Sequence, residues 1–156
     1  MLGKTTEYAI RALVYIFTQN NEGKRPGFRE VSKMIDSPEQ FTGKVLQYLT
    51  RAQIISSMRG RGGGYFFEDL TIPLTLFEVI QSVEGDEFFL KCGFGLNYCD
   101  AGAPCPMHEG YSKVRDDFFR FVNEQTIQSL AQKIDNNEAI LTRVQKVLTK
   151  NQLKWQ

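Results

Sequence analysis

Three cysteines and the only histidine of the chain stand close together, in the spacing C-x6-C-x5-C-x2-H over Cys92, Cys99, Cys105 and His108. Glycines and prolines in this stretch allow the backbone to curl, so that the thiolates can converge on one centre. Thiolate is a soft ligand that suits iron-sulfur clusters, zinc or copper(I). The sequence therefore predicts a metal or cluster site here, with His108 as a candidate fourth ligand.

The spacing alone leaves the bound group open. It matches neither the common zinc frames nor the ferredoxin runs, so zinc and iron-sulfur both remain. Three unrelated buried thiols are the simplest alternative, because buried cysteine is common. A thiol enzyme with His108 as base is another, but the chain has no C-x-x-C motif and no second histidine. An odd number of neighbouring thiols describes a local site better than a disulfide framework.

A second group of residues has the chemistry of DNA binding. Residues 38–51 repeat apolar side chains at helical spacing, and a polar, partly basic stripe shares the same predicted helix. That stripe comprises Gln40, Gly43, Lys44, Gln47 and Arg51. Basic side chains neutralise phosphates and glutamine amides pair with adenine edges, so we expect this helix to lie in the major groove. Gly43 would allow close approach to DNA or, equally, close packing within the protein.

A glycine-rich hairpin follows that helix. Strand-like segments at 54–59 and 65–67 flank the sequence GRGGG at 60–64. Arg59 and Arg61 stand on a backbone without bulky neighbours, so we expect them to reach the minor groove, with Gly62 and Gly63 beside them in the DNA-binding set. A phosphate cradle is a poorer interpretation, because no G-K-[ST] follows and Tyr65 interrupts the GxGxxG frame.

The elements that must position these residues form a recognisable order. Helices are predicted over 5–19, 28–35 and 38–51, with Ser37 as the cap of the third and Pro38 in its first turn. Three helices followed by a hairpin are typical of a winged helix-turn-helix, with the third helix in the recognition position. The predicted fold class is therefore mainly α with a small β-wing.

The second half of the chain is predicted to be helical around the cysteines. Thr75 and Glu78 have capping-box spacing and begin a helix that Gly85 ends. An irregular loop is expected from residue 86 to 110, followed by helices over 111–122, 127–134 and 139–148. This organisation predicts a DNA-binding domain over 1–70 and a cysteine loop with a helical region over 71–156.

Length and charge agree with that division. The 156 residues are 42% hydrophobic and 24% charged, which is typical of a folded globular chain. Residues 1–66 carry ten Lys and Arg against five Asp and Glu, whereas residues 67–156 carry nine against thirteen. A basic first part joined to an acidic second part indicates that only the first part meets a polyanion.

Targeting signals are not evident in the sequence. The longest apolar run, from Ala12 to Phe17, is far shorter than the roughly twenty residues of a membrane span, so no membrane partner is expected. The N-terminus shows no apolar region followed by a cleavage site. We therefore expect a cytoplasmic protein.

Taken together, these residues resemble the Rrf-two family of winged-helix transcriptional regulators, over about residues 4–134. The most specific pieces are TEYAIR at 6–11, RGRGGGY at 59–65 and the triple-cysteine loop. The resemblance implies a homodimer joined through the long helix after the cysteines, a palindromic double-stranded DNA operator, and one iron-sulfur cluster per subunit, of two or four irons.

The resemblance also implies ligands. Cys92, Cys99 and Cys105 would hold the cluster, and two residues compete for the fourth place: His108, as in cluster-biogenesis regulators of the family, and Glu7, where its nitric-oxide sensors place a carboxylate. Six residues between the first two cysteines, rather than the usual five, leave the cluster type and the signal open. The expected function is a DNA-binding regulator, not an enzyme, that senses redox state, nitric oxide or iron-sulfur status. The alternatives are a family member with zinc or with thiol oxidation as its signal, a cysteine-dependent enzyme, and a winged domain that binds other proteins.

Overall fold

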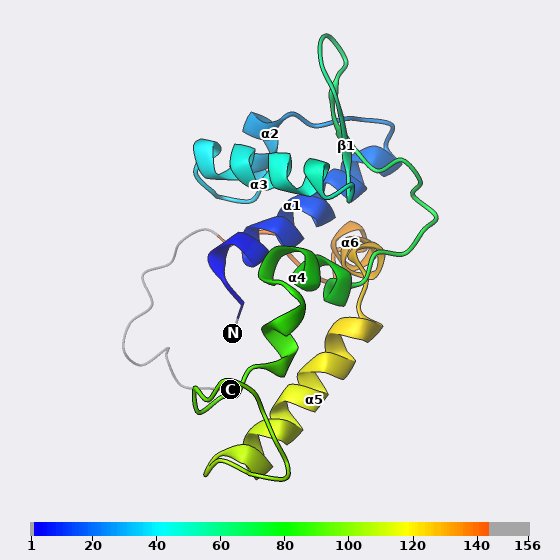
Figure 1. The fold of residues 1–156 in the computed structure, drawn as a ribbon. Helices are drawn as coiled ribbons and strands as arrows, with labels where there is room; N and C mark the ends of the chain where they lie inside the picture. Colours follow the sequence, from blue (N-terminus) through cyan, green and yellow to red (C-terminus); the bar gives the residue numbers. More distant parts are fainter. Residues whose placement is uncertain (1, 144–156) are drawn as a thin grey trace, which may run out of the picture.

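The computed structural model describes residues 2–143 and consists of helices with one small hairpin (Figure 1). Its elements are α1 (Lys4–Asn21), α2 (Phe28–Met34), α3 (Glu39–Arg51), β1 (Ser56–Met58), β2 (Gly64–Phe66), α4 (Leu76–Glu84), the 3-10 helix η1 (Asp86–Leu90), α5 (His108–Glu124) and α6 (Ile127–Asp135). The predicted order of three helices and a hairpin is confirmed, and with it the mainly helical fold class with a β-wing.

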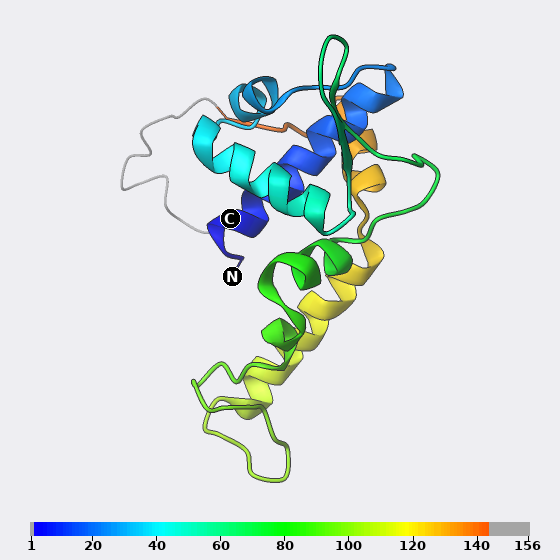
Figure 2. The same ribbon diagram turned by 45° about the horizontal axis from the view of Figure 1, so that its top comes forward.

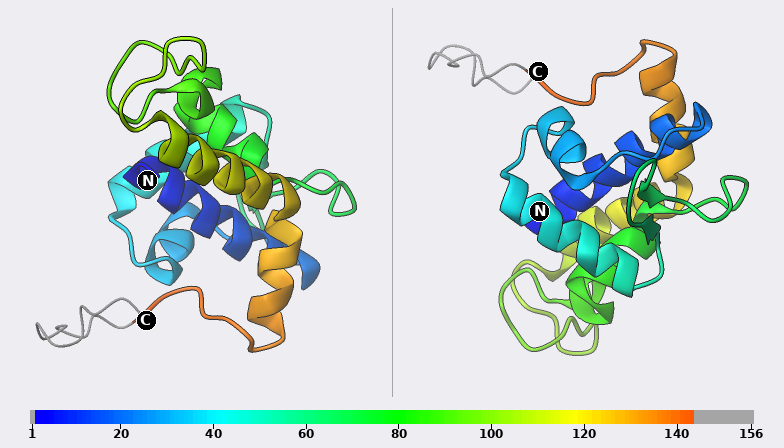
Figure 3. Two further views of the ribbon diagram at one scale, coloured as in Figure 1. Left: turned by 90° about the horizontal axis from the view of Figure 1, so that it is seen from below. Right: turned by 90° about the horizontal axis from the view of Figure 1, so that it is seen from above.

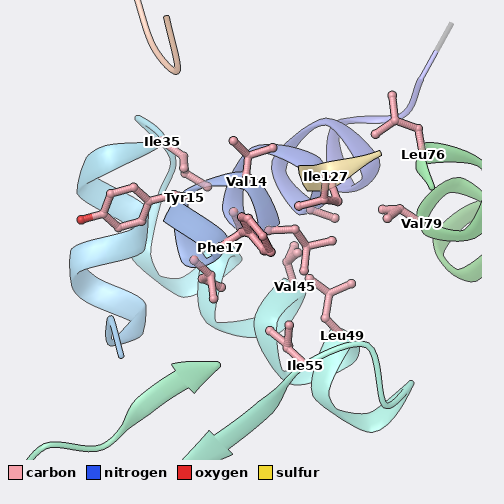
Figure 4. Packing of buried hydrophobic residues seen from close by; sticks show 14 of the residues in the cluster. Val14, Tyr15, Phe17, Ile35, Val45, Leu49, Ile55, Leu76, Val79 and Ile127 are labelled. Carbon is pink, nitrogen blue, oxygen red and sulfur yellow. The ribbon is translucent and has the colours of Figure 1, made fainter. Parts of the chain in front are cut away.

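Helix α1 lies at the centre of the core. Ala9, Ala12, Leu13 and Ile16 on this helix are completely buried, because α3, α4 and α6 all pack against it. Figure 4 shows side chains from these helices meeting in one cluster. Burying a Leu or Ile side chain contributes about 1.5–3 kcal/mol, so α1 is the scaffold on which the other helices are held.

The helix-turn-helix is formed by α2 and α3. The predicted cap of α3 is wrong in detail: Pro38 has an extended backbone (φ −60°, ψ 132°) and is itself the N-cap residue, so the helix begins at Glu39. The Ser37 hydroxyl does not cap the free amides, because it is engaged with the Thr42 hydroxyl instead. This bond and the buried residues Val45, Leu46 and Leu49 fix α3 on α2 and α1.

The wing is a two-stranded antiparallel ribbon. Ser56 pairs with Phe66 and Met58 with Gly64. The ribbon is anchored at its base, because the Tyr65 N–H donates to the Pro26 carbonyl at 2.9 Å and the Phe67 N–H donates to Asn20 Oδ1 at 2.9 Å. The wing therefore projects from α1 and the loop that follows it.

The predicted capping box at the start of α4 is confirmed. The Thr75 side chain accepts from the Glu78 N–H, and the Glu78 side chain accepts from the Thr75 N–H. Two backbone hydrogen bonds join the start of α4 to the segment between α5 and α6. The Leu76 N–H donates to Gln125 O at 2.9 Å, and the Ile127 N–H donates to Leu74 O at 2.8 Å. This junction returns α6 to α1, so the hydrophobic core includes residues from both sides of residue 70.

The irregular cysteine segment is shorter than the sequence predicts. Residues 86–90 form η1, and α5 begins at His108 rather than near Tyr111. The Tyr111 N–H already bonds the Met107 carbonyl at 2.9 Å, which extends the helix to the histidine. Figure 2 shows α5 leading away from the helical body, with the cysteine segment at its far end and the wing at the opposite end of the molecule.

The helix predicted over 139–148 is not formed where the structure describes it. Residues 139–143 are not helical, and the rest of the segment lies outside the described residues. The chain turns after α6, because Asn137 adopts a positive φ of 57° and the Glu138 N–H bonds Lys133 O at 2.8 Å. None of the helices between residues 2 and 143 combines the length and the apolar character that a membrane span requires.

Candidate nucleic-acid interface and cysteine site

A groove of about 850 Å³ lies between α3 and the wing. Six of the predicted DNA-binding residues line it: Gln40, Gly43, Gln47, Arg51, Arg59 and Gly63. They come from two elements that the core holds in place, since α3 packs on α1 and the wing is anchored to the end of α1. Figure 3 shows the wing extending well beyond the body of the molecule, as a minor-groove contact requires.

The predicted cations of α3 and the wing are exposed, and Arg51 and Arg59 line the groove, whereas Lys44 and Arg61 do not. Lys44, Arg51, Arg59 and Arg61 are all exposed. Within residues 2–143, the ion pairs of the structure involve other cations, and no carboxylate lies within 4.0 Å of these four. Unpaired basic side chains on one face are the electrostatic footprint of a nucleic-acid-binding surface.

The wing glycines are required by the turn itself. Gly60 and Gly62 have φ of +91° and +74°, which L side chains rarely adopt. A Cβ on Gly63 would lie 2.2 Å from the Met58 carbonyl oxygen. Gly43 differs, because a Cβ there would only make an ordinary contact of 3.8 Å with the Phe28 ring. Packing within the protein therefore does not explain Gly43.

Arg25 also lies at this face, although the sequence pattern does not indicate it as a DNA-binding residue. Its guanidinium lies 4.3 Å from the centroid of the Phe66 ring and 3.3 Å from Met58 Sδ, so it lies against the wing. The exposed Lys24-Arg25 pair before a Pro-Gly loop is a signal of charge, but nothing in the sequence places Arg25 beside Met58 and Phe66, which are 33 and 41 positions away. The fold brings it there through the bond between Tyr65 and Pro26.

The four predicted ligands in the cysteine segment are grouped in two pairs. Cys92 Sγ lies 3.7 Å from Cys105 Sγ, and Cys99 Sγ lies 3.3 Å from His108 Nδ1. The two pairs are connected directly, because the His108 N–H donates to the Cys105 carbonyl at 2.9 Å. Over residues 2–143, no three His, Cys, Asp or Glu side chains surround a common point as ligands of a single metal ion.

The donors around Cys92 favour its thiolate. Backbone N–H groups of Leu96, Phe94 and Gly95, together with the Cys105 thiol, lower the pKa of Cys92 against the opposing effect of burial. Amide donors that converge on a sulfur stabilise its negative charge. The local backbone is therefore suited to a thiolate ligand before any metal arrives.

Glu7 is not brought to the cysteines within one chain. It lies in the first turn of α1 and forms an ion pair with Lys4 at 2.7 Å. The pKa of Glu7 is lowered, and the hydrogen bond from Lys4 is the largest cause. Of the two candidates for the fourth ligand, the described chain places only His108 beside a cysteine.

Comparison with known proteins decides the family. The sequence pattern of the Rrf2 family, described as iron-dependent transcriptional regulators, matches residues 2–133. The chain belongs to the Rrf2 family. Among curated relatives of this Rrf2 chain, the transcriptional regulator NsrR of Oceanobacillus iheyensis is 26% identical over 141 residues, which cover 90% of this chain and 93% of the relative.

Solved Rrf2 structures have the same fold. The IscR structure from T. potens superposes with a TM-score of 0.68 at 14% identity, and covers 89% of this chain and 91% of its own. CymR, the global cysteine regulator of B. subtilis, gives 0.67 at 17% identity, with 85% and 96% covered. At these identities the likeness shows the winged-helix fold alone.

Proposed function

We propose that this Rrf2 protein is a homodimeric, DNA-binding transcriptional regulator whose DNA affinity depends on an iron-sulfur cluster held by its cysteine segment. One observation carries the proposal: the described part of the chain has a groove lined by exposed arginines at one end and paired Cys and His donors at the other. The groove has the chemistry of a DNA-binding surface, and the Cys and His donors have the chemistry of a metal-based sensor.

The groove supports binding to double-stranded DNA. Helix α3 would enter the major groove with Gln40, Gln47, Lys44 and Arg51, and the wing would reach the minor groove through Arg59 and Arg61, with Gly62 and Gly63 at its turn. A dimer with two-fold symmetry requires a roughly palindromic operator, with half-site centres about 34–36 Å apart or a multiple of that.

Helix α5 supports the homodimer. Val114 and Phe121 on this helix are 60% and 50% exposed, although they are large and apolar. Phe118 stacks on Phe121 with their ring centroids 6.5 Å apart, which extends the apolar surface along the helix. Exposed apolar surface of this kind marks an interaction site, and a second copy of α5 would cover it.

The donor set fits a cluster with more than one metal. Two thiolates on one tetrahedral metal, with bonds near 2.3 Å, lie about 3.8 Å apart. The Cys92–Cys105 separation of 3.7 Å matches that value. Because Cys99 and His108 form a second pair next to the first, these four side chains would hold a two-iron cluster rather than one zinc ion. When bound, the cluster supplies reversible one-electron chemistry and lability toward oxygen or nitric oxide.

The chain itself provides a short connection from the cysteines to the DNA-binding elements. The cysteine segment follows η1 and α4 directly. At the end of α4, Glu84 Oε1 accepts from the Thr6 hydroxyl at 2.5 Å and from the Gly3 N–H at 3.0 Å, and the Ser82 carbonyl accepts from the Tyr48 hydroxyl of α3. A displacement of α4 would therefore reach both α1 and the recognition helix, and so bias the population that fits DNA.

Anaerobic purification followed by absorption spectroscopy and by iron, sulfide and zinc analysis tests the cofactor. We expect a coloured protein with about two irons and two sulfides per chain, and loss of both in the Cys105→Ser variant. A colourless protein with one zinc per chain would reject the cluster and favour the zinc alternative.

Selection of genomic fragments at low salt tests the DNA-binding half of the proposal. We expect the full-length protein to enrich fragments that share an inverted repeat. Failure to retain any fragment would favour a winged domain that binds proteins instead.

A further inference from the structure

Arg115 differs from its basic neighbours on α5. Its side chain is 24% exposed, whereas Lys113 and Arg120 on the same helix are 72% and 66% exposed. The Arg115 side chain lines a cavity of about 420 Å³ together with Phe89, Tyr98, Cys99 and Phe119. A long cationic side chain held in such surroundings has lost much of its hydration, so its polar partners determine its stability.

Two polar partners hold the guanidinium. Arg115 Nε and Nη2 donate to Asp116 Oδ1 at 3.2 and 3.1 Å. Cys99 is the other partner: burial lowers the pKa of Arg115, but hydrogen bonding and charge interaction with Asp116 and Cys99 raise it overall. The guanidinium is thus a permanent positive charge next to the Cys99 sulfur.

Cys99 has two polar side chains as neighbours. Its sulfur lies 3.3 Å from His108 Nδ1, and Arg115 lines the same cavity as Cys99. Backbone N–H groups hydrogen-bond to the Cys92 sulfur, whereas the neighbours of the Cys99 sulfur are the side chains of His108 and Arg115. Donors to ligand sulfurs and nearby charge are the means by which proteins set the reduction potential of a cluster.

We infer that Arg115 is a positioning residue for Cys99, which compensates the negative charge of that thiolate ligand and thereby raises the reduction potential of the cluster and slows its loss. This inference rests on the proposed function. Reduction adds one electron from an external reductant to the bound group, without a proton or a broken bond. The fixed cation stabilises the added negative charge, so removing the cation favours the oxidised form.

The test uses full-length protein, reconstituted anaerobically with ferrous iron and sulfide, in the wild-type, Arg115→Gln and Arg115→Lys forms. Arg120→Gln is the matched control, because Arg120 lies on the same helix but is exposed and paired with Asp117 at 3.0 Å. Each protein is titrated with dithionite in the presence of mediator dyes. Iron loss to a chelator is followed by the visible absorption.

Arg115→Gln is expected to shift the reduction equilibrium about tenfold toward the oxidised form, which is about 59 mV for a one-electron couple. It is also expected to lose iron several-fold faster. Arg115→Lys keeps the charge and should recover most of the potential, which a merely structural role would not produce, and Arg120→Gln should match the wild type. Equal potentials and equal iron loss in the wild type and Arg115→Gln would overturn the inference while leaving the proposed function intact. A wild-type protein that takes up no iron would overturn both.

Discussion

Removing the two wing arginines is expected to change how DNA binding responds to salt. Arg59 and Arg61 are exposed, and neither is among the ion pairs of residues 2–143. Each cation that neutralises a phosphate contributes about 0.9 to the slope of log affinity against log salt. The Arg59→Ala/Arg61→Ala variant removes two such cations from each subunit. In a dimer the slope should therefore become shallower by about 3.6.

That change in slope has a large practical consequence. Between 50 and 200 mM salt, the wild type should lose about a hundredfold more affinity than the double variant. Fluorescence anisotropy with one labelled operator at four or five salt concentrations measures both slopes. Lys113→Ala is the control, because Lys113 lies on α5 and is paired with Glu109 at 3.3 Å. An unchanged slope in the double variant, or an equal reduction in the control, would refute the placement of the wing on DNA.

Three further substitutions test the structure that supports these sites. Gly64→Ala should weaken DNA binding and retain the helical circular dichroism, because a Cβ there would lie 2.2 Å from a backbone oxygen of the loop before α2. The control Gly110→Ala should bind DNA normally, because a Cβ at Gly110 has no neighbouring atom within 4 Å. Glu84→Ala should lower the free energy of unfolding by about 1–3 kcal/mol in urea titrations, because it leaves the buried Thr6 hydroxyl without its acceptor. An unchanged urea midpoint would contradict this. Ile80→Ala should cost about 2–5 kcal/mol in the same assay, because Ile80 is fully buried, and a loss below 1 kcal/mol would place that side chain outside the core.

Local patterns predict most of the helices and the wing. The apolar spacing of α1, α2 and α3 and the capping box at Thr75 are properties of adjacent residues, so the sequence contains them. Ser37 illustrates the limit of this reasoning, because its hydroxyl has a competing partner in Thr42 one turn later. Residues 139–143 are not helical for a similar reason, since the turn at Asn137 ends the regular backbone.

Contacts between distant residues could not be predicted in the same way. The cysteine spacing predicts a metal site, but an irregular segment has no periodicity from which to derive that Cys92 lies beside Cys105, and Cys99 beside His108. Arg115 lines a cavity together with Cys99 because α5 folds back along the cysteine segment. The choice between His108 and Glu7 likewise depends on where α1 lies, which no local pattern specifies.

The most direct test compares the affinity of one dimeric preparation for its selected operator before and after its iron is removed anaerobically with a chelator, at a fixed salt concentration. Coupling between a sensor and a DNA-binding surface is typically worth five- to 150-fold in affinity. We expect a change in the dissociation constant within that range, and no change in a Cys99→Ser variant treated identically. The same dissociation constant with and without iron in the wild-type protein would contradict the account.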